Sequence, residues 1–267
     1  MRAQAPSRTA SARIVVAVVG TYQIGKSSLI NCLLPSTGRK AKVGNGWKSE
    51  TMQADEYVLP DDIVLIDTPG VDDNAGRDAC TMDAIKRAHC VLFVCENNTA
   101  PGELYSNWAG QLKRWNKPCL FVCNCREGNA GRRQRWNPQS EWNADFCRKS
   151  VSEAFIAKNG FDMFMTVGGR QVLPVNACWA LYGKGELDDE EKNDDVETVL
   201  RREGVDGSQL REAAWVRSNV PLLCEFIRNV RLEILSHSLT DRNRIVAGMA
   251  DRFREELAMR LSGRKGR

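Results

Sequence analysis

Apolar and polar residues follow one another along this chain in a pattern that predicts alternating strands and helices. Short runs rich in apolar and β-branched residues predict six β-strands, at residues 14–19, 55–59, 62–67, 90–95, 118–123 and 171–175. Helical spacing of apolar residues appears near residues 26–34, 78–88, 103–116, 140–159 and 219–236. We therefore predict an α/β fold with a doubly wound, mostly parallel six-stranded sheet, in which ligands bind at the carboxyl ends of the strands.

The second and third predicted strands are joined by a very short connection. Only Pro60, Asp61 and Asp62 separate the run that ends at Leu59 from the run that begins at Ile63. Residues of these types form turns, and so short a turn joins antiparallel neighbours. The sequence therefore predicts a β-hairpin here, within an otherwise parallel sheet.

The clearest chemical motif directly follows the first predicted strand. Residues 20–27 read Gly-Thr-Tyr-Gln-Ile-Gly-Lys-Ser and match the phosphate-loop pattern G-x-x-x-x-G-K-S/T, with a predicted helix after them. Such a loop directs backbone N–H groups and the positive end of the helix dipole at phosphate oxygens. The predicted nucleotide contacts are Gly20, Tyr22, Gln23, Ile24, Gly25, Lys26, Ser27 and Ser28. The alternative is an ordinary glycine-containing turn between a strand and a helix.

A second polar element ends the third predicted strand. Asp67 follows a buried-looking apolar run, where a carboxylate is costly unless it has a partner. We expect that partner to be Mg²⁺ that is also bound by the hydroxyl of Ser27. Gly70, three residues later, can bring its N–H close to a γ-phosphate. The alternative is a strand-terminal turn, since Asp-Thr-Pro-Gly is good turn chemistry.

With these two elements in this order, the chain resembles the GTPase branch of the phosphate-loop proteins. The sequence Ser-Ser-Leu-Ile-Asn after Lys26, together with Asp-Thr-Pro-Gly, is similar to the translation-factor, septation, AIG and dynamin-related group, within which no single family stands out. The resemblance implies a Mg²⁺-dependent protein that binds GTP and GDP and hydrolyses GTP as a switch or assembly GTPase. It also implies that strand 55–59 is the antiparallel edge of the sheet.

The resemblance further implies a magnesium-binding threonine between the two phosphate-side elements. Thr51, in the polar segment 44–51, is our candidate, and Ser49 is the alternative. Metal ligands are thus expected at Ser27, Thr51 and Asp67. Lys26, Gln23 and Thr51 form the expected catalytic set.

One catalytic group of Ras-like enzymes is missing. They carry a glutamine directly after the glycine of the D-x-x-G motif, where this chain has Val71, which cannot orient an attacking water. We therefore expect slow hydrolysis without an activator or a dimer. Gln23 is the candidate replacement, although it could equally serve only to line the loop. A cationic finger could come from Arg39, Lys40 or Lys42.

The base-recognition element is degraded. Where relatives carry N-K-x-D, this chain has Asn124-Cys125-Arg126-Glu127. The Glu127 carboxylate can still accept hydrogen bonds from guanine, but it is one methylene longer, and Cys125 removes the packing that lysine provides beneath the base. Asn176 and Ala177 follow the sixth strand, and the Ala177 N–H is expected to meet the base oxygen. A relaxed NTPase that uses ATP or GTP, and a nucleotide-binding interaction module without significant hydrolysis, are the alternatives.

Composition limits the domain number, the class of partner and the location that we expect for this protein. A chain of 267 residues accommodates one large domain and an appendage, and a net charge of +4 is too small to indicate nucleic acid. No apolar run is long enough to span a membrane and no secretory signal is visible, so a cytoplasmic protein, with peripheral membrane contact as the alternative, is expected. The ten cysteines include no C-x-x-C pair and indicate reduced thiols.

The predicted domain organisation has three parts. Residues 1–13 are expected to be a disordered tail, residues 14–236 the GTPase-like domain with insertions near 126–165 and 183–217, and residues 237–267 an amphipathic helix. Arginines interleaved with tryptophans in the first insertion could contact RNA, although a solvated loop is favoured. The acidic block 186–197 in the second is expected to be solvated. A homodimer through the nucleotide face and an unknown protein activator are the expected partners besides GTP.

Overall fold

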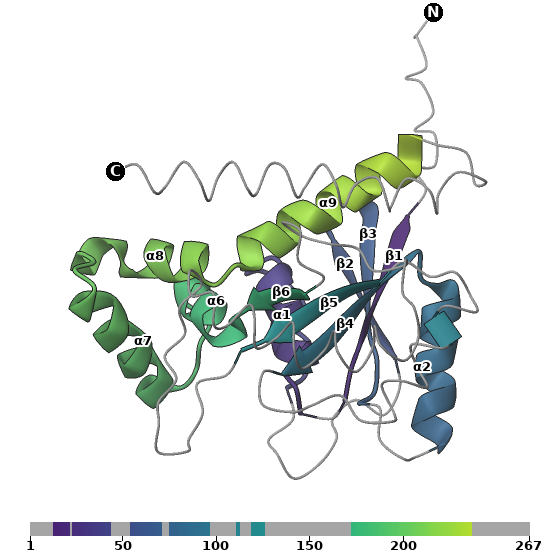
Figure 1. Ribbon diagram of the computed structural model, residues 1–267, viewed down its shortest axis with the longest axis horizontal. Coiled ribbons are helices and arrows are strands. Elements are labelled where there is room, and N and C mark those ends of the chain that lie inside the picture. Colours follow the sequence, from purple (N-terminus) through teal and green to yellow (C-terminus); the bar gives the residue numbers. More distant parts are fainter. Residues whose placement is uncertain are drawn as a thin grey trace, which may run out of the picture.

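The computed structural model describes residues 13–21, 23–43, 54–70, 75–96, 111–112, 119–125 and 172–236. Their centre is a six-stranded sheet in the order β2-β3-β1-β4-β5-β6 (Figure 1). The strands are β1 (Ile14–Val19), β2 (Asp55–Leu59), β3 (Ile63–Asp67), β4 (Cys90–Glu96), β5 (Cys119–Asn124) and β6 (Val172–Val175). Every neighbouring pair is parallel except β2 and β3, which are antiparallel. The predicted doubly wound sheet with one antiparallel edge strand is confirmed.

Eight helical segments are described around the sheet. They are α1 (Lys26–Leu33), η1 (Pro60–Asp62), α2 (Ala75–Arg87), α6 (Ala177–Lys184), α7 (Glu190–Arg202), η3 (Gly207–Gln209), α8 (Leu210–Arg217) and α9 (Val220–Ser236). The predicted helices at 26–34, 78–88 and 219–236 correspond to α1, α2 and α9. The predicted helix at 140–159, nearly all of that at 103–116, the tail before Arg13 and the segment 237–267 lie outside the described residues. No helix in the described ranges is both long and apolar enough to cross a bilayer.

Two layers of helix cover the two faces of the sheet. Leu29 and Ile30 of α1 and Phe226 and Ile227 of α9 pack in one apolar cluster, and α9 runs diagonally across the molecule in Figure 1. Ile85 of α2 belongs to a second cluster on the opposite face. Because β1, β3, β4 and β5 are buried on both faces, their sequences are nearly continuous apolar runs.

Helices α6, α7 and α8 form a unit beyond β6, at the end of the sheet opposite α2 (Figure 1). The acidic block 186–197, which was expected to be solvated, corresponds in part to the amphipathic helix α7. Its Val196, Val199 and Leu200 are buried in the same cluster as Trp179 of α6, while its charged residues face outward. α6 and α8 cross closely, since a Cβ on Gly183 would lie 2.8 Å from the carbonyl oxygen of Arg211. The same cluster contains Phe121 of β5 and Val172 of β6, which attaches the unit to the sheet.

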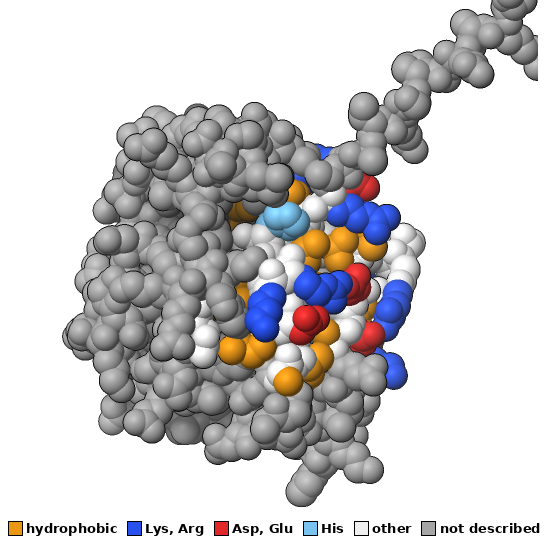
Figure 2. Space-filling model, turned by 90° about the vertical axis from the view of Figure 1, so that its right-hand side faces the viewer, with side chains coloured by type: hydrophobic (Ala, Val, Ile, Leu, Met, Phe, Trp, Pro, Cys, Tyr) orange, Lys and Arg blue, Asp and Glu red, His pale blue; other side chains and the backbone are white. Residues whose placement is uncertain are grey.

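The face that carries α2 and the edge strand has charges of both signs. Arg87 of α2 forms ion pairs with Glu56 of β2 and with Asp83. Figure 2 shows basic and acidic side chains lying next to each other over this face, with a histidine near them. Among the described residues of this face, the mixed signs form no continuous basic stripe of the kind that nucleic-acid binding needs.

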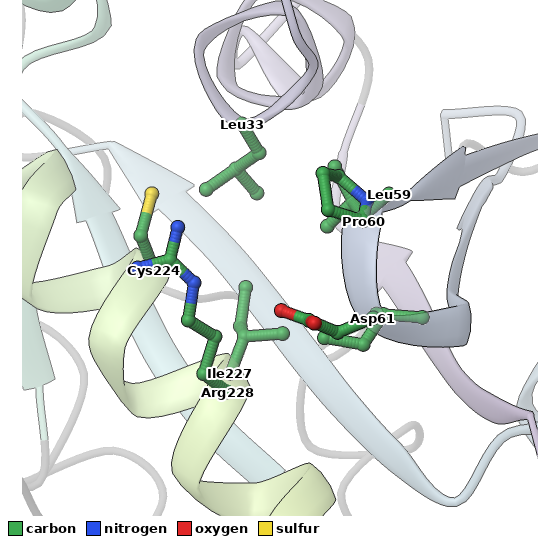
Figure 3. Close-up of a pocket in the computed structure, with 8 residues that line it drawn as sticks. Leu33, Leu59, Pro60, Asp61, Cys224, Ile227 and Arg228 are labelled. Carbon is green, nitrogen blue, oxygen red and sulfur yellow. The ribbon is translucent and has the colours of Figure 1, made fainter.

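A small cavity lies beneath the β2–β3 hairpin. About 40 Å³ of space is surrounded by Leu33 of α1, by the hairpin residues Leu59 to Asp61, and by Cys224, Ile227 and Arg228 of α9 (Figure 3). This volume suits a water molecule rather than a nucleotide. The cavity lies by Ile63, at the beginning of β3, whereas Asp67 is at the carboxyl end of the same strand. The candidate functional site lies at the carboxyl ends of the strands, away from this cavity.

Candidate functional site

The carboxyl ends of four strands bring the predicted site residues together. The phosphate loop follows β1, Asp67 ends β3, Asn124 ends β5, and Asn176 follows β6. Direct side-chain hydrogen bonds connect these loops across 40 to 100 residues of sequence, from Ser27 to Asp67 and from Asn124 to the backbone of Ile24. The strand-end arrangement expected of a doubly wound sheet is therefore present.

Each of the two glycines of the phosphate loop is required for a different structural reason. A Cβ on Gly20 would lie 2.3 Å from Cδ1 of Ile24 and 2.4 Å from the carbonyl oxygen of Val94 on β4, so no side chain fits there. Gly25 has φ 86° and ψ 28°, the left-handed conformation that glycine adopts without strain. Gln23 is also left-handed, with φ 61°, and its side chain is exposed. The loop thus turns sharply over a short distance, as phosphate binding requires.

Gly20→Ala is expected to lower the free energy of unfolding by about 1–3 kcal/mol, because the added methyl group meets the backbone of β4, which cannot move aside as a side chain could. Urea unfolding measures the change. Gly207→Ala is the matched control, since its Cβ would lie 3.4 Å from the mobile guanidinium of Arg201. Equal stability of the two variants would show that the close approach of β4 to Gly20 does not destabilise the alanine variant.

Lys26 is held within the loop that it is expected to serve. Its side chain is buried, and Nζ donates hydrogen bonds to the carbonyl oxygens of Gly20, at 3.1 Å, and Thr21, at 2.8 Å. No side chain caps the first turn of α1, and no acidic residue lies in that turn. The first N–H groups of the helix therefore face the loop with a positive partial charge, next to an ammonium group, which is suited to a phosphate anion.

Ser27 and Asp67 form the pair that was predicted to bind Mg²⁺. The Ser27 hydroxyl donates to Oδ2 of Asp67 at 2.9 Å. Asp67 is only 1% exposed, and its Oδ1 has no hydrogen-bond partner among the described residues. A buried carboxylate oxygen without a partner is unfavourable unless a ligand supplies the charge.

The electrostatics of Asp67 agree with this geometry. Burial raises the pKa of its carboxyl to about 6, while the Ser27 hydrogen bond and the Lys26 charge act in the opposite direction and Asp55 adds to the rise.

One carboxylate and one hydroxyl are too few for an all-protein metal cage, and no cluster of three or more acidic, histidine or cysteine ligands exists in the described part of the chain. Mg²⁺ is commonly held by one or two protein oxygens together with substrate phosphates, so the residues present fit this ion.

The backbone after Asp67 is fixed on both sides. The Thr68 hydroxyl donates to the carbonyl oxygen of Val18 at 2.8 Å, and the Thr81 hydroxyl of α2 donates to the carbonyl oxygen of Pro69 at 3.4 Å. Gly70 is buried directly after them. These contacts hold the loop of Asp67 against β1 and α2.

Asn124 joins the phosphate loop to the loop after β6. Its Nδ2 donates to the carbonyl oxygen of Ile24 at 3.0 Å, and its Oδ1 accepts from the Ala177 N–H at 3.2 Å. The Asn176 side chain accepts from the Trp179 N–H and so caps α6. In this structure Ala177 and Asn176 therefore use their polar groups within the protein, and their predicted contacts with the base stay predictions.

Cys125 does not lie where the missing lysine would support a base. Its side chain is 4% exposed and packs in the apolar cluster, with Sγ 3.7 Å from the Cys123 carbonyl oxygen. The other half of the base-recognition element, Glu127, lies outside the described residues, as do Tyr22, Ser49, Thr51 and Val71. Ser28 lies in the first turn of α1.

Two of the three candidate finger residues have structural partners. Arg39 forms an ion pair with Asp55 and lies over the ring of Tyr57, 5.1 Å from its centroid. Lys40 forms an ion pair with Glu186 at 2.8 Å. Lys42 is exposed. The structure therefore favours Lys42 over the other two as a finger.

Several residues that shape the site carry no sequence signal. Lys184 of α6 donates to the carbonyl oxygens of Asn31, Cys32 and Leu34, and so caps the end of α1. Glu186 accepts from both Lys184 and Lys40. A lysine and a glutamate after a short helix read as ordinary surface residues, and only the fold brings them to α1.

Comparison with known proteins agrees with the motifs. Residues 15–125 match the family model described as 50S ribosome-binding GTPase. GTPase Era of Ruminiclostridium cellulolyticum is 30% identical over 117 residues, which are 41% of this chain and 38% of that protein. GTPase Der of Desulforudis audaxviator is 32% identical over 119 residues, 41% of this chain and 26% of that protein. The chain thus spans well under half of the length of these curated relatives.

Solved structures of Era are also similar. Era of Aquifex aeolicus bound to GDP.AlF4- is 20% identical with a TM-score of 0.44, and the match covers 70% of this chain and 56% of that one. A complex of Era with MgGDPNP and nucleotides 1506–1542 of 16S ribosomal RNA has the same identity and TM-score, with coverage of 71% and 57%. The sequence match and the site described above identify residues 15–125 as a P-loop GTPase domain of the translation-factor-type group.

Proposed function

We propose that this protein binds GTP with Mg²⁺ and hydrolyses it, and that the bound nucleotide controls a switch or an assembly step. The observation that carries the proposal is the Ser27–Asp67 pair, whose second carboxylate oxygen is buried without a partner next to the phosphate loop. Lys26 supplies the positive charge on the other side of the same loop. This combination of groups matches a nucleoside triphosphate with a divalent cation better than any other ligand.

The residues of the chain have distinct tasks in this proposal. The loop N–H groups and Lys26 bind the phosphates and stabilise the charge that develops as the terminal phosphoryl group leaves. Ser27 and Asp67, with Thr51 as the proposed third ligand, hold Mg²⁺, which when bound neutralises charge on the phosphate oxygens. Gln23 is the proposed group that orients the attacking water, and its exposed position at the tip of the loop is compatible with that task. With Val71 after the D-x-x-G motif, hydrolysis is expected to be slow without an activator or a dimer.

Relaxed base specificity is the second candidate, and a specific observation favours it. Cys125 packs into the core, so nothing at that position supports the base from below. Competition of GTP, ATP and xanthosine triphosphate for one fluorescent guanine nucleotide separates the two candidates. A preference of at least ~100-fold for GTP, about 2.7 kcal/mol, supports the GTPase, whereas similar constants for GTP and ATP support a general NTPase.

Hydrolysis is tested separately from binding. Phosphate release is measured under single-turnover conditions, with excess protein, for the wild type and for Lys26→Ala. A Mg²⁺-dependent rate above that of the variant supports an enzyme. Equal background rates, with tight binding by the wild type, would instead support an interaction module that uses nucleotide as a structural ligand.

Partners of the whole protein are proposed on the same basis. The description of the matching family favours a ribosomal particle, and the interleaved arginines of residues 126–136 are candidates for RNA contact. We also propose a cytoplasmic location, and a dynamin-like homodimer through the nucleotide face as the source of activation. Sedimentation of the protein with ribosomal subunits, and its mass in solution with GDP and with a GTP analogue, test the two kinds of partner.

A further inference from the structure

The turn between α8 and α9 lies directly behind the loop that is expected to recognise the base. The Ser218 carbonyl oxygen accepts a hydrogen bond from the Asn176 N–H at 2.9 Å. The Asn219 amide Nδ2 donates to the Pro174 carbonyl oxygen at 3.0 Å. These two bonds hold the backbone on both sides of Val175, immediately before Ala177. The loop after β6 is therefore fixed from a segment more than 40 residues later in the chain.

The turn itself is rigidly built. The buried Ser218 donates its hydroxyl to the Trp215 carbonyl oxygen at 2.7 Å and accepts from the Val220 N–H at 3.2 Å. Asn219 has φ 59°, in the left-handed region that asparagine tolerates better than most residues. One residue thus lets the chain change direction between two helices and directs an amide at β6. Either property alone would be compatible with several residue types, but asparagine supplies both.

Hydrogen bonds continue from this turn to the phosphate loop. After Asn176 comes Ala177, whose N–H donates to Asn124 at 3.2 Å, and Asn124 donates to the Ile24 carbonyl oxygen at 3.0 Å. Asn176 is 2% exposed, so water cannot replace the bond to its N–H if the turn moves. A shift of the α8–α9 turn would therefore displace the Ala177 N–H and the Asn124 side chain together.

We propose that Asn219 is a positioning residue for nucleobase recognition, which holds the loop after β6 where Asn124 and Ala177 can meet a guanine base. The inference rests on the proposed function and names a specificity element for the same site. Asn219 lies outside the residues matched by the family model. Misplacement of a recognition loop by a fraction of an ångström weakens contacts with the base, while contacts with the phosphates depend on the phosphate loop and α1.

Asn219→Gly tests the proposal, because glycine keeps the left-handed turn and removes the amide. Calorimetry with Mg²⁺ measures the affinity of the full chain for GDP and for inorganic tripolyphosphate, which has no base. We expect GDP affinity to fall about 5- to 20-fold, with tripolyphosphate affinity changed less than about twofold. Asn219→Asp, which keeps the shape but cannot donate, is expected to behave in the same way.

Asn193→Ala is the matched control. Its amide donates to the Leu187 carbonyl oxygen at 3.0 Å, a side-chain-to-backbone bond within the same helical unit that does not touch the loop after β6. The control should leave both affinities unchanged. Wild-type GDP affinity in both Asn219 variants, or an equal loss of GDP and tripolyphosphate binding, would overturn the proposal. If the wild type bound tripolyphosphate and no guanine nucleotide, the proposed function itself would be wrong, which the variants alone could not indicate.

Discussion

Replacement of Lys26 by alanine is expected to lower the affinity for GTP at least ~100-fold, about 2.7 kcal/mol. The ammonium group of Lys26 already lies inside the phosphate loop, bound to two loop carbonyl oxygens, so it needs little reorganisation to reach a phosphate. Its removal takes away a buried positive charge and leaves those carbonyl oxygens without their donor. Calorimetry with GTP and with GDP, in the presence of Mg²⁺, measures the loss.

Lys86→Ala is the control for this experiment. Lys86 is exposed in the last turn of α2, at the end of the sheet away from the phosphate loop, so its removal subtracts the same charge without touching the loop. Affinity should stay within about threefold of the wild type, since charges separated by water are largely screened. If both variants bound GTP as the wild type does, the phosphate loop would not be the nucleotide site.

Asp67→Asn is expected to make the ligand-free protein more stable and the enzyme inactive. Burial raises the pKa of the Asp67 carboxyl from 3.8 to about 6, so the folded protein holds this proton more tightly than the unfolded chain does. The free energy of unfolding therefore falls as the pH rises through that window, and above it the whole unfavourable effect, about 3 kcal/mol, is present. Asparagine carries no charge and removes this effect, yet it is a poor ligand for Mg²⁺.

Urea unfolding at pH 7.5 and at pH 4 tests the stability half of this expectation. Asp67→Asn should exceed the wild type at pH 7.5 and resemble it at pH 4, where the wild-type carboxyl is protonated. Asp83→Asn, on the exposed surface of α2, should change little at either pH. Lower stability of Asp67→Asn at pH 7.5 would contradict the conclusion that the buried, ionised carboxylate destabilises the folded protein. Phosphate release that stayed Mg²⁺-dependent in this variant would contradict the metal site.

The sheet was predictable because its strands are buried on both faces. Such strands appear in the sequence as uninterrupted apolar runs that end at turn-forming residues, and the bounds of β1 and β2 agree with the predicted ranges. Helices α6, α7 and α8 were missed because two of them are only eight residues long and the third has acidic residues throughout its first half. Their contacts are with one another, with α1 and with α9, and no local sequence pattern reports such contacts.

The residues of the candidate site likewise fall into those that the sequence identified and those that only the fold revealed. Gly20, Lys26, Ser27 and Asp67 were found because each acts within a local motif of strand, turn and helix. Lys184, Ser218 and Asn219 act through backbone groups that are distant in sequence, and any polar residue at their positions would have looked ordinary. Asn124 lies between these cases, because the motif identified it, while its bonds to Ile24 and Ala177 required the fold.

The cap that Lys184 places on α1 has a consequence for the order in which the protein is made. Lys184 follows Leu34, whose carbonyl oxygen it binds, by 150 residues. At a synthesis rate of about 5–20 residues per second, the growing chain therefore carries its phosphate loop and α1 for roughly 8–30 s before their cap emerges. β6 and α9, which complete the sheet and cover α1, are made in the same late interval. A newly synthesised chain is thus expected to acquire nucleotide only after residues 172–236 have emerged, so that a chain stalled or truncated before them stays without it.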